Sequence, residues 1–172
     1  MKKIMFPILL AILFVIGCEN TMNTPTMKIE NFFSKYQKMD KEVLEELDYL
    51  LEKEKDMTAK QKEKYKSLLE RQYQNLSYKI TNEEIIKNKA VVDIEVEVLN
   101  YRDAINNAKE YYLTYPEQFL TEEEYLDYKL EEISKVQGLI KYKMIINLEK
   151  KNNIWEIEDL TNEDRQKIHG LY

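Results

Sequence analysis

The stretch Val92-Asp93-Ile94-Glu95-Val96-Glu97-Val98 decides the fold of this chain. Apolar and acidic residues alternate along it without interruption, and successive side chains of a β-strand point to opposite faces. The stretch therefore predicts a strand with one apolar face and one acidic face. An apolar sheet face has to be buried under a second layer, so a two-layer domain is expected.

Further segments with the same alternation predict a four-stranded sheet. The additional segments are residues 76–80, 139–149 and 155–157. Turns are expected at residues 87–89, where Asn88 tolerates a left-handed backbone, and at residues 150–153. The chain contains no internal repeat, and we expect these strands in a single domain.

The charges on the outward faces indicate the order of the strands. The first strand carries Lys79, the second its three acids, the third Lys141 and Lys143, and the fourth Glu156 and Glu158. Opposite charges on neighbouring strands are favourable, whereas like charges that face each other are not. The alternating signs therefore predict a sheet in which consecutive strands are neighbours.

Three amphipathic helices precede the strands. Residues 27–39 carry apolar side chains at positions i, i+3, i+4 and i+7 of a helix. Asp40 is placed to cap a second helix, and Thr58 and Gln61 have the spacing of a capping box that opens a third. The opposite faces of these helices are rich in lysine and glutamate, which is typical of solvated surface.

Two more helices lie between the second and third strands. The first is expected over residues 102–112, with a continuation toward Tyr115, and Thr121 opens the second with glutamates in its first turn. Thr161 is placed to cap a short terminal helix. The expected fold class is therefore α+β: an antiparallel four-stranded sheet with helices packed on one face, in the order α-α-α-β-β-α-α-β-β.

The N-terminal segment has the features of a targeting signal. Two lysines precede an apolar run over residues 4–17, which is shorter than the roughly 20 residues that span a bilayer. The run leads into Val15-Ile16-Gly17-Cys18, which resembles the bacterial lipobox. The resemblance implies cleavage between Gly17 and Cys18 and two or more acyl chains on Cys18. The alternatives are an uncleaved signal anchor and a cysteine that merely follows an apolar run.

The domain organisation follows from this interpretation. Residues 1–17 are the signal peptide, residues 18–26 the lipidated cysteine with a polar tether, and residues 27–172 a single α+β domain. Cleavage would remove two lysines with the signal peptide. The mature chain then has 24 basic and 32 acidic residues and a net charge of −8. An acidic chain without a basic patch argues against nucleic acid as a partner and against adsorption on anionic lipid. The acyl chains are therefore expected to hold the protein on the membrane.

Three segments also resemble a family of small bacterial lipoproteins. They are Ile29-Glu30-Asn31-Phe32-Phe33, residues 88–96 and residues 148–157 with the single tryptophan, Trp155. Together with the element order they resemble lipoproteins with an NTF2-like (cystatin-like) domain, of the DUF4878 and DUF5105 types. The resemblance implies a fold and a place in the cell envelope, but no reaction. Some NTF2-like folds hold an acid–base site in a pocket, whereas the inward faces predicted here are apolar.

Residues that carry out chemistry are few. The only histidine, His169, lies near the C-terminus on a segment that is expected to fray, so a surface histidine is the simpler interpretation. The only cysteine is the lipidation site, which argues against hydrolase triads, and the sequence has no HExxH, P-loop or GxGxxG motif. The acidic runs at 122–124 and 131–132 are typical of helix starts and solvated faces. No catalytic residue, metal ion or cofactor is therefore expected.

The thirteen tyrosines are the remaining functional signal. Five of them gather with a phenylalanine in the two inserted helices, and this group is Tyr111, Tyr112, Tyr115, Phe119, Tyr125 and Tyr128. One interpretation is that the rings close the edge of the core and keep their hydroxyls in water. The other is that they form a partner surface, because aromatic side chains are enriched at interfaces.

The sequence thus predicts a lipid-anchored, extracytoplasmic binding lipoprotein without catalytic activity. It would be held on the cell membrane or the outer membrane and face the periplasm or the cell surface. Its partner would be a protein or a small apolar ligand. The alternatives are an enzyme or ligand carrier of the NTF2-like pocket type, and a structural envelope lipoprotein with no ligand.

Overall fold

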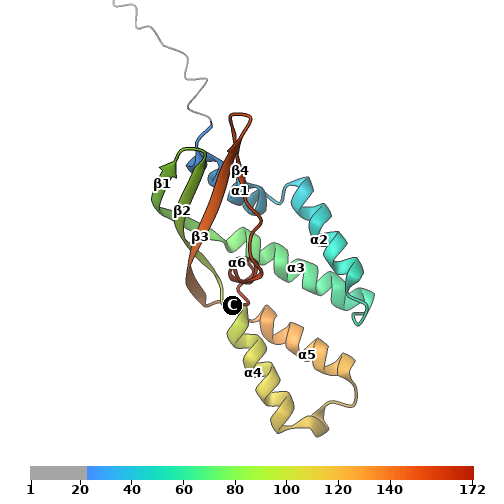
Figure 1. Ribbon diagram of the computed structural model, residues 1–172. Helices are drawn as coiled ribbons and strands as arrows, with labels where there is room; N and C mark the ends of the chain where they lie inside the picture. Colours follow the sequence, from blue (N-terminus) through green and yellow to red (C-terminus); the bar gives the residue numbers. More distant parts are fainter. Residues whose placement is uncertain (1–22) are drawn as a thin grey trace, which may run out of the picture.

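The computed structural model describes residues 23–172 as two layers, with a four-stranded antiparallel sheet covered on one face by helices (Figure 1). The expected α+β class, with helices on one face of the sheet, is confirmed. The signal segment and Cys18 lie outside the described residues. Among residues 23–172, no helix is long and apolar enough to cross a membrane.

The elements follow the expected order, with one extra turn and the terminal helix. The strands are β1 (Ser77–Ile86), β2 (Lys89–Leu99), β3 (Leu139–Lys151) and β4 (Ile154–Ile157). The helices are α1 (Pro25–Lys38), α2 (Lys41–Lys53), α3 (Ala59–Asn75), α4 (Tyr101–Thr114), α5 (Glu122–Ser134) and α6 (Asn162–Ile168), and a 3-10 turn, η1 (Pro116–Gln118), joins α4 to α5.

The strand order β1-β2-β3-β4 is the expected one, but the expected pairing of unlike charges holds only from β1 to β3, because Glu156 of β4 lies opposite Glu149 of β3. Lys79 lies opposite Glu95, which lies opposite Lys143 in turn, and Glu97 lies opposite Lys141. The Lys141 Nζ atom is 3.2 Å from a carboxylate oxygen of Glu95 and 3.9 Å from one of Glu97. Exposed pairs of this kind contribute at most about 1 kcal/mol each, so they select the register more than they stabilise the fold.

The apolar face of the sheet forms the main core. The inward side chains of β2 are fully buried, and Trp155 of β4 is buried at the edge of the same face. Helices α1, α3 and α6 contact this face. The ring of Phe33 on α1 stacks on that of Tyr78 on β1 at 4.6 Å between centroids. The alternating pattern from Val92 to Val98 therefore organises the core as expected.

The two hairpin turns explain where the strands end. Asn152 and Asn153 both have positive φ, at 50° and 66°, which a two-residue turn between antiparallel strands favours. In the other turn, the positive φ of 57° falls on Lys87, so the expectation that Asn88 takes the left-handed backbone was wrong. The pairing of Ile86 with Lys89 places Lys87 first in the turn, and this position sets which residue takes the unusual conformation.

A bulge in β1 brings a carboxylate onto the helix side of the sheet. The register shifts between Ile80 and Asn82, so Glu83 pairs with the inward-facing Val92. The Glu83 carboxylate accepts hydrogen bonds from the backbone N–H of Thr26 at 2.9 Å and from its hydroxyl at 2.7 Å. This negative charge complements the N-terminus of α1, which has no acidic residue in its own first turn.

The helix caps agree with the sequence in most places. The capping box of Thr58 and Gln61 opens α3, and Thr161 opens α6 with a box of its own. Helix α1 begins at Pro25, two residues before the expected start, because the Thr24 side chain caps it. Asp40 precedes α2 as expected, but its side chain makes no capping hydrogen bond, so its expected role as a side-chain cap was wrong.

The C-terminal segment is docked on the domain, so the expectation of a frayed end with a surface histidine was wrong. The Gly170 carbonyl accepts a hydrogen bond from Arg102 N–H at 2.8 Å, and the Tyr142 hydroxyl donates to the Tyr172 carbonyl at 2.7 Å. His169 is partly buried, with its Nδ1 atom 3.3 Å from the Tyr73 hydroxyl. The contacts that hold the segment come from distant parts of the chain, which local periodicity does not show.

Candidate functional site

Helices α4 and α5 form an arm that projects from the sheet, at the end of the molecule opposite to the start of α1 (Figure 1). The Asn100 side chain caps α4 by accepting a hydrogen bond from Asp103 N–H. The Tyr101 ring is buried, and its hydroxyl donates to the Leu68 carbonyl of α3 at 2.9 Å. Ala108 is fully buried, which lets α4 and α5 approach closely.

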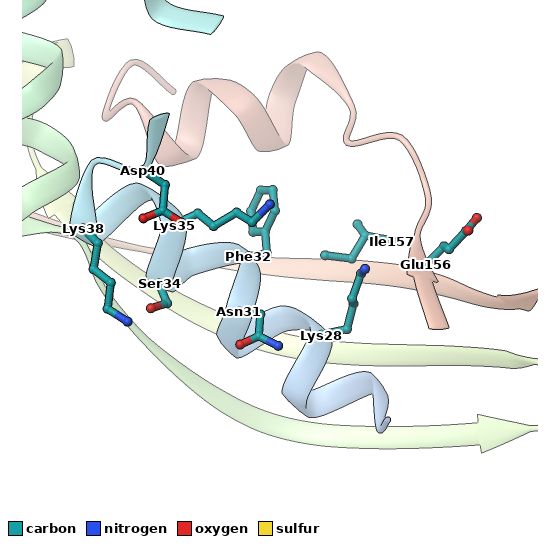
Figure 2. Close-up of a pocket in the computed structure, with 9 residues that line it drawn as sticks. All are labelled: Lys28, Asn31, Phe32, Ser34, Lys35, Lys38, Asp40, Glu156 and Ile157. Carbon is teal, nitrogen blue, oxygen red and sulfur yellow. The ribbon is translucent and has the colours of Figure 1, made fainter. Parts of the chain in front are cut away.

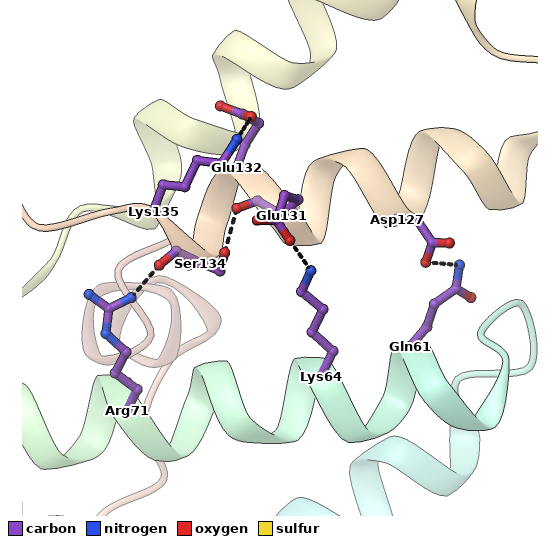
Figure 3. Close-up of polar contacts among 8 residues, drawn as sticks. All are labelled: Gln61, Lys64, Arg71, Asp127, Glu131, Glu132, Ser134 and Lys135. Carbon is purple, nitrogen blue, oxygen red and sulfur yellow. Dashed lines mark hydrogen bonds and ion pairs between the residues drawn. The ribbon is translucent and has the colours of Figure 1, made fainter.

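Polar contacts hold α5 along α3, as Figure 3 shows. The buried amide of Gln61 donates to Asp127 at 2.9 Å, and the Lys64 ammonium lies 2.5 Å from Glu131. Arg71 donates to two carbonyls at the end of α5 and just beyond it. These contacts run along α5, whereas the outer half of α4 packs on α5 and on the η1 segment with Phe119. The arm therefore has a fixed base and a tip that extends into solvent.

The six aromatic residues expected to form a partner surface are brought together at this tip. Tyr112 and Tyr125 stack with ring centroids 4.2 Å apart, and Phe119 lies 5.5 Å from Tyr112 and 5.8 Å from Tyr125. Tyr111 lies 5.0 Å from Tyr115 and 5.2 Å from Tyr128. Phe119, which follows η1, also contacts Tyr128 at 5.4 Å and so joins the two groups into one aromatic cluster.

These rings are mostly covered by one another. Tyr111, Tyr112, Phe119, Tyr125 and Tyr128 are partly buried, and of the six only Tyr115 is exposed, at 44%. The cluster thus serves as a small core for the arm, in agreement with the packing interpretation. Its surface is still apolar, because part of each ring faces solvent.

Two leucines beside the cluster were missed by the sequence reasoning. Leu113 is 68% exposed and Leu120 is 86% exposed, and each directly neighbours residues of the cluster in the chain. An available signal was that both are large aliphatic residues at the ends of the inserted helices, outside the helical stripe. With Tyr115 they form the apolar tip, which we define as Leu113, Tyr115 and Leu120.

The surroundings of the apolar tip are acidic. Over residues 109–124 the sequence has one lysine and five glutamates, which gives a local net charge of −4. Burial raises the pKa of the Tyr125 and Tyr128 hydroxyls, so both phenols are neutral at pH 7. The arm thus presents an apolar centre with a negatively charged rim.

A groove lies beside α1, and two cavities lie beside His169. The groove, of about 770 Å³, follows the outer face of α1, where Lys28, Lys35 and Lys38 project along it (Figure 2). The two cavities, of about 250 and 220 Å³, meet at Leu50 and His169, between α2, α3 and the C-terminal segment. Their walls are mainly leucine, tyrosine and isoleucine side chains.

The ionisable side chains in the walls of the cavities beside His169 are His169 itself, three tyrosines, Glu46, Glu54 and Arg165. Burial, with a smaller effect of the Arg165 charge, lowers the His169 pKa to about 4, so the ring is neutral at pH 7. Burial raises the pKa of Tyr36 to about 12 and raises that of Tyr73 further. Among residues 23–172 the buried polar side chains are Gln61 and Gln72, and no three acidic, histidine or cysteine residues gather as metal ligands.

Comparison with models of known protein families, with curated proteins and with solved structures finds no match to this chain.

Proposed function

We propose that the chain is a lipid-anchored, extracytoplasmic interaction lipoprotein without catalytic activity. The lipobox-like segment ending in Gly17 and Cys18 supports the anchor, and the arm supports the interaction. Acyl chains on Cys18 would hold the protein on the membrane, and the apolar tip of the arm would contact a protein partner. The assignment of the domain to the NTF2-like class is part of the same proposal.

The exposure of Leu113 and Leu120 on the aromatic cluster carries the proposal. Single exposed leucines are ordinary, but here two exposed leucines and an exposed tyrosine lie within eight residues of sequence, beside an aromatic cluster. The cluster is already ordered by ring–ring contacts, so binding would cost little side-chain entropy. The glutamates around it favour a partner surface with an apolar recess and basic residues at its edge.

The anchor is tested by replacing the lipidation site with Cys18→Ser. The unmodified protein is expected in the membrane fraction, and its intact mass should show cleavage after Gly17 and the added acyl chains. The variant is expected to leave the membrane fraction. A variant that stays in the membrane, or a mass without lipid on the unmodified protein, contradicts the anchor.

The partner surface is tested by co-purification from cross-linked membranes. A protein captured by the anchored form should be lost with Leu113→Asp/Leu120→Asp, which places two charges in the apolar tip. The matched control is Ile145→Asp, because Ile145 is also exposed but lies on the outer face of the sheet. If the two variants capture the same proteins in equal yield, the arm is not the contact surface.

A second candidate function is the carriage of a small apolar ligand, which the cavities beside His169 favour. Each is smaller than the roughly 300 Å³ at which drug-sized sites begin, so only a short or flat ligand fits. Decanoate is a suitable probe, since its chain matches the apolar walls and Arg165 lies at one cavity. Binding should raise the melting temperature of the unmodified protein, and Leu50→Asp should abolish that increase. No increase at millimolar decanoate would argue against this function.

A further inference from the structure

Two hairpin turns form the end of the domain at which the described part of the chain begins. The Asn23 side chain accepts a hydrogen bond from Trp155 N–H at 3.2 Å and donates to the Asn153 carbonyl, so the start of the described chain lies on the β3–β4 turn. Lys150 N–H donates to the Asn88 carbonyl at 2.7 Å, which ties this turn to the β1–β2 turn. In Figure 1 both turns and the start of α1 lie together at one end.

This surface lies within a short chain length of the lipidation site. Asn23 follows Cys18 by five positions in the sequence, and an extended chain over five residue steps spans at most about 18 Å. If Cys18 is lipidated, the two turns cannot lie far from the headgroups of the bilayer. The arm, at the opposite end, then points away from the membrane.

The surface gathers four lysines, although the mature chain is strongly acidic. Residues 85–89 and 149–156 contain these lysines and two glutamates, a local net charge of +2. The two glutamates, Glu149 and Glu156, lie 3.6 and 3.5 Å from Lys151, and Glu83 and Glu84 adjoin the surface on β1. The lysines are Lys87, Lys89, Lys150 and Lys151. About sixty residues separate the two pairs in the sequence, so the sequence shows no basic patch and the fold creates one. The rest of the mature chain then carries −10, which gives the domain a strong charge asymmetry along its length.

Exposed isoleucines accompany these lysines. Ile86 is 61% exposed, Ile154 is 56% exposed and Ile85 is 49% exposed. Ile85 and Ile86 end β1 directly before the β1–β2 turn, and Ile154 begins β4 directly after the other turn. Apolar side chains flanked by lysines are typical of surfaces that rest in the interfacial region of a bilayer.

Building on the proposed lipid anchor, we propose that the end formed by the two turns is a membrane-contact surface that recognises anionic phospholipid headgroups. The lysines would contact phosphate groups and the isoleucines would enter the interfacial region. Each lysine increases such a binding equilibrium by about fivefold, which is weak for a free protein. The anchor confines the domain to the surface, so even a weak contact is populated. Repulsion between the acidic remainder and the anionic headgroups would hold the domain upright.

The test measures which end of the anchored protein approaches the headgroups. A fluorescent label is placed in the full chain at Asn88→Cys, in the β1–β2 turn, or at Glu117→Cys, near the tip of the arm. In the lipidated protein Cys18 is blocked, so the new thiol is the only one that reacts. The proteins are reconstituted in vesicles of equal parts phosphatidylglycerol and phosphatidylcholine that carry a nitroxide quencher on a headgroup.

The expected result is strong quenching at position 88 and little at position 117. Lys87→Gln/Lys89→Gln should weaken the docked state by about 30-fold and reduce the quenching at 88, since two lysines are lost. The matched control Lys60→Gln/Lys109→Gln removes the same charge from exposed sites elsewhere and should change nothing.

Three results would overturn the membrane-contact surface. They are equal quenching at the two positions, equal quenching at position 88 in vesicles of phosphatidylcholine alone, and no effect of the two lysine substitutions. A failure of the anchor itself is distinguishable, because an unlipidated protein shows a free Cys18 in its intact mass before any vesicle is added.

Discussion

The partly buried imidazole of His169 should make the stability of the fold depend on pH in a defined interval. It is the only histidine in the chain, and burial lowers its native pKa from 6.5 to about 4. Between these values the unfolded chain binds a proton that the native protein does not bind. The free energy of unfolding is therefore expected to decrease as the pH falls from about 6.5 to about 4, and the contribution of His169 is constant below that interval.

The size of the effect follows from the two pKa values. Each pKa unit corresponds to about 1.4 kcal/mol, so the full difference sets an upper limit of about 3 kcal/mol. Between about pH 7 and pH 5.5 the same values give a loss of about 1 kcal/mol, because the unfolded histidine is then mostly protonated. The partial access of the ring to water reduces these figures somewhat, so about 1 kcal/mol is the largest loss expected in that interval.

Urea unfolding at about pH 7 and pH 5.5 measures this loss, with His169→Gln as the reference. The glutamine cannot titrate, so the variant reports the contribution of all carboxylates and the difference between the two proteins isolates the imidazole. The unmodified protein should lose about 1 kcal/mol more than the variant. If both proteins lose the same free energy, His169 is solvated in the native state and the docked C-terminal segment described above is wrong.

Two further predictions concern the join between α3, β2 and the C-terminal segment. The buried Gln72 amide donates to the Leu99 carbonyl at 3.0 Å and accepts from the Leu99 N–H at 2.9 Å. Gln72→Leu should therefore lower the free energy of unfolding by about 2–4 kcal/mol. The control Gln137→Leu, at an exposed glutamine, should change it little. Gly170 has a φ of 69° and a Cβ there would lie 2.1 Å from the Leu99 carbonyl oxygen, so Gly170→Ala should cost at least about 2 kcal/mol. Gly138→Ala, with open space around it, should cost less than about 1 kcal/mol. Urea midpoints measure all four variants, and equal costs within either pair would contradict the packing.

The sheet is the part of this fold that the sequence predicts best. Strand alternation is a local property, so residues 92–98 predict their own buried face without knowledge of the partners. The order of the strands followed from Lys79, Lys141 and Lys143, because unlike charges on neighbouring strands are favourable. These predictions hold because each depends on nearest neighbours in the sheet.

The errors concern residues whose structure depends on distant contacts. His169 has no local signal for burial, since the contacts of its segment come from Tyr73, Arg102 and Tyr142. Asp40 has the sequence features of a cap, but its side chain makes no bond to α2. The basic surface was also missed, because Lys87 and Lys150 are separated in the sequence and meet only in the fold.

The aromatic cluster was predicted in part. Its members were identified from composition and spacing, and the fold unites them because α4 and α5 run antiparallel. The sequence could not show that the rings cover one another, because the buried Ala108 on α4 and the bonds from Gln61 and Arg71 to α5 depend on contacts between distant residues. The exposed Leu113 and Leu120 were missed because they lie outside the apolar stripes of the helices.

The arm leaves and rejoins the sheet at adjacent points, and this makes it separable. Leu99 pairs directly with Leu139, and Asn100 N–H donates to the Gly138 carbonyl at 2.9 Å. Excision of residues 101–137 would join Asn100 to Gly138, and Asn-Gly is the sequence that best closes a two-residue β-hairpin. Such a miniature would expose Leu68, which then needs a polar substitute, but it would keep the main core and the membrane-proximal end. The strand pairing thus predicts that β2 and β3 would still form a hairpin if the arm were removed.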